Sequence, residues 1–106
     1  MMETSMSDVT TTPRLKPKIT VTRPPLYKVM LLNDDYTPRE FVVVVLKKVF
    51  RMGEDQAYKV MMSAHRLGAA VVAVFTREIA ETKADEANML GREAGYPLTF
   101  SIEKDE

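Results

Sequence analysis

The 106-residue chain contains no cysteine, and it has only four glycines and a single histidine. Without cysteine it can form no disulfide, no thiolate zinc site and no cysteine nucleophile, and this composition fits a reducing compartment. It also lacks any run approaching the ~20 apolar residues that a membrane-spanning helix requires. The first residues, MMETSMSDVT, lack the apolar segment of a secretory signal. We therefore expect a soluble cytoplasmic protein with no membrane partner.

An excess of charge of either sign is also missing, because fifteen basic and fifteen acidic side chains cancel. No overall field would therefore attract the chain to nucleic acid or to an anionic membrane. The local exception is RLKPKITVTR, residues 14–23, which carries four basic side chains and no acid. It has no interleaved aromatic residue for stacking on bases, so we interpret it as a solvated linker and expect no nucleic-acid partner.

The length allows one domain with one hydrophobic core. Residues 1–24 are rich in threonine, proline, serine and charge, and they show no hydrophobic period. We expect them to form a flexible N-terminal tail. The pattern changes at residue 25, and we expect residues 25–106 to form the folded core.

Within that core, the apolar pattern predicts three strands and three helices. YKVMLLN (27–33) is short, apolar and bounded by proline and polar residues, which indicates a strand. AAVVAVF (69–75) is continuously apolar and predicts a buried central strand. LTFSIE (98–103) alternates and predicts a half-solvated strand. Helices are expected over 38–50, 54–68 and 77–95, so the element order β-α-α-β-α-β predicts an α+β fold with helices on one face of a small sheet.

The first helix is predicted from its flanks, since its four consecutive valines by themselves favour a strand. Thr37 offers an N-cap hydroxyl, Pro38 suits the first helical position and Glu40 completes a capping box. Gly53 is available to end this helix.

Similar capping residues mark an end of each of the other two helices. Gly68 is expected to end the second helix, and Thr76 to cap the third. The third helix carries small residues at helical spacing, which we expect to let it lie close to the sheet. These residues are Ala80, Ala84, Ala87, Gly91 and Ala94.

Polar residues gather where the first strand should meet the first helix. Asn33, Asp34 and Asp35 lie at that junction, and the second helix carries His65 with Met61 and Ala64 beside it. A cationic group could meet acid, amide and imidazole there, above an apolar floor. The residues alone leave other interpretations open, because such groups also form turns, cap helices or serve as structural histidines.

Catalytic patterns are weak in this sequence. It has no glycine-flanked serine elbow and no glycine-rich phosphate loop, so covalent and nucleotide chemistry are not expected. A small metal-dependent hydrolase built from Asp34, Asp35 and His65 is one alternative, although no second histidine offers a ligand spacing. A structural domain that binds a partner through its charged third helix is another. We expect no enzyme activity, no metal and no cofactor.

Four segments together resemble the ClpS family of bacterial adaptor proteins: PPLYKVMLLNDDYTPREFV, MMSAHRLG, VFTREIAETK and YPLTFSIEK. The resemblance covers about residues 24–104 with every element in order. It implies a small three-stranded antiparallel sheet packed by three helices. It also implies a non-catalytic adaptor for the N-end rule, which binds peptides that begin with Phe, Tyr, Trp or Leu. Such an adaptor delivers these N-degron proteins to the ClpA unfoldase of the ClpAP protease.

Matched positions imply a role for each site residue. Those matching the family's site for the α-amino group are Asn33, Asp34 and His65. Those matching its hydrophobic pocket are Thr37, Arg39, Val42, Met61, Ala64 and Leu98, with Asp35 and Tyr36 in support. Those matching its contact surface for the N-terminal domain of ClpA are Glu78, Glu81, Thr82 and Lys83, and the tail would help to engage the unfoldase.

Two pocket positions depart from the family pattern. Arg39 stands where many members carry a gating methionine, and Ala64 stands where valine is common. We expect Ala64 to widen the cavity, and Arg39 to lay its stem across the rim with its head in water. These two departures leave the preference among Leu, Met and aromatic first residues open, in either the stricter or the looser direction.

Overall fold

The computed structural model describes residues 23–106. Residues 1–22, which make up most of the predicted tail and nearly all of the basic stretch, lie outside the described residues. The described elements run in the order β1 (Leu26–Leu32), α1 (Arg39–Phe50), α2 (Glu54–Leu67), β2 (Ala69–Thr76), α3 (Arg77–Glu93) and β3 (Thr99–Lys104). None of the helices in this part of the chain is long and apolar enough to cross a membrane.

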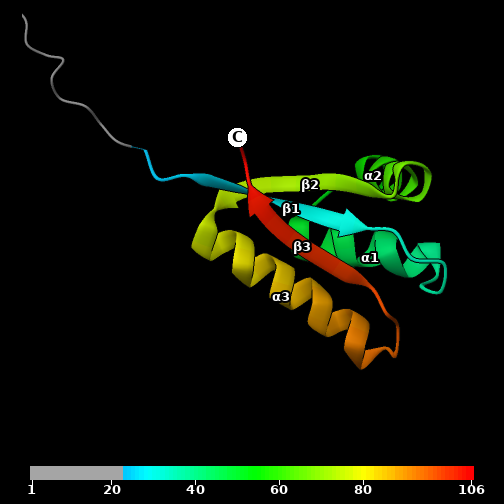
Figure 1. Cartoon of the computed structure of the whole chain (residues 1–106). Coiled ribbons are helices and arrows are strands. Elements are labelled where there is room, and N and C mark those ends of the chain that lie inside the picture. The colour runs from blue at the N-terminus through cyan, green and yellow to red at the C-terminus, as the bar shows by residue number, and fades with distance from the viewer. Residues whose placement is uncertain (1–22) are drawn as a thin grey trace, which may run out of the picture.

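The three strands form one antiparallel sheet in the order β2-β1-β3, and the helices lie on one side of it (Figure 1). This arrangement confirms the α+β prediction and its element order. Val29 and Leu31 of β1 point into the core with Phe100 of β3, whereas Leu26 and Val74 are exposed on the other face. The core therefore lies between one face of the sheet and the helices.

The position of β2 differs from the prediction. The continuous apolar run predicted a buried central strand, but β2 is an edge strand and β1 is central. Val71 and Val74 in this run are exposed, and β2 contains one bulge. Register slips between Val29 and Met30, whose partners are Ala73 and Val71, so Val72 is an extra residue on β2 and points into the core. The bulge breaks the alternation that an edge strand usually displays.

The start of α1 also differs from the prediction. Pro38, with φ −59° and ψ 140°, is the N-cap residue, and no side chain caps the helix. Thr37 lies one residue before the N-cap position, and its hydroxyl donates to the carboxylate of Asp34. The helical prediction for the valine run is nonetheless confirmed, because the run lies within α1, where Val42, Val43 and Val45 are buried.

The junction between α1 and α2 uses a different residue from the one predicted. Arg51, with φ 59°, adopts the left-handed conformation that ends α1. Gly53 is extended and is the N-cap residue of α2 instead. Gly68 ends α2 in the left-handed conformation, as predicted, and Thr76 occupies the N-cap position of α3 without a side-chain hydrogen bond.

The small-residue face of α3 packs as predicted along most of its length. Ala80, Ala84, Ala87 and Gly91 are buried, while Ala94 is the C-cap residue and is exposed. Next to this face, the Asn88 side chain bonds to the backbone of β3. Its Nδ2 donates to the Phe100 carbonyl oxygen at 3.0 Å, and its Oδ1 accepts from the Phe100 N–H at 2.7 Å. Asn88 thus satisfies the outward-facing backbone of β3 as a further strand would.

Candidate functional site

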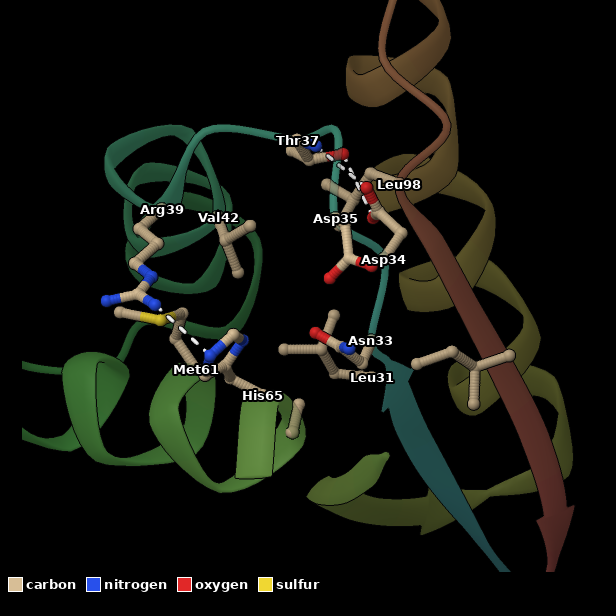
Figure 2. A pocket seen from close by; sticks show the side chains of 12 residues that line it. Leu31, Asn33, Asp34, Asp35, Thr37, Arg39, Val42, Met61, His65 and Leu98 are labelled. Carbon is tan, nitrogen blue, oxygen red and sulfur yellow. Dashed lines mark hydrogen bonds between the residues drawn. The ribbon is translucent and has the colours of Figure 1, made fainter. Parts of the chain in front are cut away.

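A pocket of about 140 Å³ opens where the end of β1 meets α1, α2 and the segment before β3 (Figure 2). It is lined by Leu31, Leu32, Asn33, Asp34, Asp35, Thr37, Arg39, Val42, Met61, Ala64, His65 and Leu98. Every residue that the resemblance assigned to amine binding or to the hydrophobic pocket therefore lines one cavity. Tyr36 does not line it and is 80% exposed. Leu31 and Leu32 were missed, although they directly precede the polar cluster in the sequence.

Asp34 organises the loop between β1 and α1. Its Oδ1 accepts hydrogen bonds from the Tyr36 N–H at 2.9 Å and the Thr37 N–H at 2.7 Å, and its Oδ2 accepts from the Thr37 hydroxyl at 3.0 Å. Asp34 thus performs the turn chemistry that the sequence left open. A carboxylate has about four lone-pair sites, so three bonds leave room for a further donor.

Asn33 is held close to α2 by its backbone. Its N–H donates to the Gly68 carbonyl oxygen at 3.0 Å, just beyond the end of α2. Gly68 follows His65 by three residues, so this bond fixes the end of β1 relative to the helical turn that carries the imidazole. Figure 2 shows Asn33 and His65 on opposite sides of the same opening.

The floor of the pocket belongs to the hydrophobic core. Val42 comes from α1, Met61 and Ala64 come from α2, and Leu98 precedes β3; all four are buried. Side chains in a close-packed core keep defined positions, so the floor is formed before any ligand arrives. The pocket can hold an apolar group below a rim that carries acid, amide and imidazole.

Arg39 and His65 meet at the rim. The Arg39 Nη2 lies 3.2 Å from the His65 Nε2, so Arg39 reaches from α1 to α2 (Figure 2). Arginine has donors only, so Nε2 is the acceptor where this contact is a hydrogen bond. Both side chains are exposed, in keeping with the expectation that the Arg39 head stays in water.

Residues 23–106 contain no ligand set for the metal-dependent hydrolase alternative. Within residues 23–106, no three histidine, aspartate or glutamate side chains come together in a way that could hold a metal ion. Asp34, Asp35 and His65 all line the pocket, yet the Asp34 carboxylate is engaged by its own loop. The hydrolase hypothesis therefore lacks a centre in this part of the chain.

The residues matched to the ClpA contact surface lie in the first turns of α3. Glu81 accepts from Arg77 at 3.2 Å, and the Thr82 hydroxyl donates to the Glu78 carbonyl oxygen at 3.1 Å. Lys83 is half-buried and has a structural bond that sequence reasoning missed. Its Nζ donates to the Val49 carbonyl oxygen in the last turn of α1 at 3.0 Å. A contact across 34 positions leaves no local signal in the sequence.

Comparison with known proteins identifies close relatives. Residues 22–101 match the family model described as ATP-dependent Clp protease adaptor protein ClpS. A protein from Agrobacterium fabrum called ATP-dependent Clp protease adapter protein ClpS 2 is 63% identical over 105 residues, which are 99% of this chain and all of that protein. One from Bradyrhizobium diazoefficiens called ClpS 1 is 61% identical over 101 residues, which are 95% of this chain and all of that protein.

A solved structure is also similar. It is Agrobacterium tumefaciens ClpS2 bound to L-phenylalaninamide, with a TM-score of 0.77 and 70% sequence identity. The match covers 78% of this chain and all of that one. The likeness therefore extends over the whole fold of the solved protein.

Proposed function

This chain belongs to the ClpS family of Clp protease adaptors, and we propose that it binds proteins through a free α-amino group and a bulky hydrophobic first side chain. The proposed first residues are Phe, Tyr, Trp and Leu. The bound proteins are delivered to the ClpA unfoldase for degradation by ClpAP. The protein performs no chemistry of its own.

The observation that carries this proposal is the position of polar acceptors above a preformed apolar pocket. An ammonium group has three donors and no acceptor, so it needs acceptors that include a negative charge. Asp34 supplies the charge, Asn33 supplies a carbonyl oxygen and neutral His65 supplies a ring nitrogen. L-phenylalaninamide, the ligand of the similar A. tumefaciens protein, has both a free α-amino group and a large apolar side chain.

The apolar half of the ligand would enter below the rim. Burying one large side chain contributes about 1.5 to 3 kcal/mol, which alone is too little for useful affinity. Hydrogen bonds to the charged amine add about 1.5 to 3 kcal/mol each. The amine therefore decides whether a peptide binds, and the pocket decides which first residue is accepted.

The binding experiment is fluorescence anisotropy with one labelled peptide that begins with Phe, in free-amine and acetylated forms. Acetylation removes the charge and leaves the rim acceptors without their donors, so we expect affinity to fall at least about a hundredfold. Equal binding of both forms, or binding of neither, would mean that the polar cluster only shapes the loop.

Delivery is proposed to use the exposed face of α3. Replacing Glu78 by Lys should weaken binding to the isolated ClpA N-terminal domain and leave peptide binding unchanged. Glu86→Lys is the matched control, because Glu86 is exposed on the same helix but outside the proposed contact. Lys83 is a poor choice for this test because its bond to Val49 also supports the end of α1.

A further inference from the structure

A second hollow of about 460 Å³ lies between α1 and α2, beside the pocket. We call it the α1–α2 groove. Its lining consists of Arg39, Glu40, Val43, Val44, Lys47, Glu54, Tyr58 and Met61. Arg39 and Met61 also line the pocket, so the two hollows share a wall.

The groove has regular sides because the two helices present matching rows of residues. Arg39, Val43 and Lys47 follow one another at intervals of four on α1, which places them on one face. On α2, the spacing of Glu54, Tyr58, Met61 and His65 likewise keeps these residues on one face. The groove therefore runs along the two helices.

A polar bridge between the helices stands at each end of these rows. At the pocket end, Arg39 Nη2 contacts His65 Nε2 at 3.2 Å. At the far end, Lys47 Nζ donates to Glu54 Oε1 at 2.6 Å. Arg39 and Lys47 are eight positions apart, which corresponds to about 12 Å along a helix. An extended chain advances about 3.3 Å per residue, so this length accommodates three or four residues.

Between the bridges, the groove exposes apolar surface. Val43 is buried at its base, whereas Val44 is 52% exposed and Tyr58 is 53% exposed. The charged residues around them comprise two bases and two acids, so the groove has no net charge with which to select a charged ligand. Its surface suits an extended segment with apolar side chains and a hydrogen-bonding backbone.

We propose that the α1–α2 groove binds the second to fourth residues of the peptide whose first residue occupies the pocket. This inference rests on the proposed function. The first residue of a protein is always followed by more chain. The groove lies on the other side of Arg39 and Met61 from the pocket, so that chain would pass over the Arg39–His65 contact to reach it. Large apolar side chains at these positions pack against Val44 and Tyr58. The adaptor therefore selects among proteins with the same first residue by their following residues.

The test compares three ligands by isothermal titration calorimetry with the full chain: L-phenylalaninamide, the tetrapeptide amide Phe-Leu-Leu-Leu and the tetrapeptide amide Phe-Ser-Ser-Ser. We expect the leucine peptide to bind at least about fivefold more tightly than the serine peptide, the size of effect expected from one well-packed contact. Tyr58→Ala and Val44→Ser should each abolish most of that difference and leave the affinity for L-phenylalaninamide unchanged.

Met89→Ala is the matched control, because Met89 is a half-exposed apolar residue on α3, outside both hollows. It should change none of the three affinities. Equal affinities of wild type for the two tetrapeptides would overturn the proposed role of the groove without affecting the proposed role of the pocket. An equal loss of affinity for all three ligands in Tyr58→Ala and Val44→Ser would also overturn the proposed role of the groove. Failure of wild type to bind L-phenylalaninamide would overturn the proposed function and the groove together.

Discussion

Gly91 of α3 lies so close to Leu98 that a Cβ atom at position 91 would be 2.9 Å from the Leu98 Cβ and 3.5 Å from its carbonyl oxygen. Leu98 is a buried wall of the pocket. The absence of a side chain on one helix therefore sets the position of a residue that contacts the ligand in our proposal. Because the close atoms are a backbone oxygen and a Cβ, Leu98 could not yield by side-chain rotation alone.

Gly91→Ala should lower the free energy of unfolding by up to about 2 kcal/mol. Alanine favours helix by about 1 kcal/mol, but forcing a methyl group into a packed contact costs about 1 to 3 kcal/mol, so overpacking should prevail. The displaced Leu98 should also weaken binding of a peptide that begins with Phe. Urea denaturation and anisotropy measure the two effects. Gly53→Ala is the control, since a Cβ there meets no atom within 4 Å, and greater stability of Gly91→Ala would contradict the prediction.

Replacing Asp34 separates its two roles. Asp34→Ala removes the acceptor of three hydrogen bonds and should destabilise the protein by about 1 to 3 kcal/mol. Asp34→Asn keeps an oxygen for the two N–H donors and should nearly preserve stability. It removes the charge, so affinity for a free-amine peptide should fall about tenfold to a hundredfold in anisotropy titrations. Wild-type affinity in Asp34→Asn would limit this residue to loop formation.

Arg39→Met should strengthen binding of a free-amine peptide about two- to tenfold. A neutral imidazole has one acceptor nitrogen, and Arg39 holds it at 3.2 Å. The α-amine must displace that hydrogen bond, which contributes about 0.5 to 1.5 kcal/mol. Lys48→Met is the control for the loss of one positive charge on the same helix, and the same anisotropy titration measures both variants. Weaker binding by Arg39→Met would show that the guanidinium assists the ligand.

The order and type of the elements could be predicted from the apolar segments together with the residues that flank them, and for the valine run of α1 the flanks decided in favour of a helix. The central strand could not, since a continuously apolar run such as residues 69–75 is compatible with a central strand and also with an edge strand that contains a bulge. The predicted N-cap was wrong by one position. α1 begins after Pro38, so Thr37 lies before the cap, where its hydroxyl donates to the Asp34 carboxylate.

The lining of the pocket was predicted by resemblance, and the pocket gathers those residues although Asn33 and Leu98 lie far apart in the sequence. The contacts that tune the site were not predicted. Arg39 and His65 are 26 positions apart, and Lys83 and Val49 are 34 apart. Such pairs depend on how the helices pack, which no local pattern encodes. The assigned roles of the pocket residues remain predictions until binding is measured.

The two hydrogen bonds between the Asn88 side chain and the Phe100 backbone have a consequence for the proposed function. An open strand edge readily recruits extended polypeptide by backbone pairing, whatever its sequence. A protein that escorts substrates to an unfoldase would meet such polypeptide constantly. By occupying the Phe100 N–H and carbonyl oxygen itself, the adaptor withholds them at this point of the sheet from indiscriminate strand addition. Strand addition at Phe100 therefore does not compete with binding at the proposed pocket.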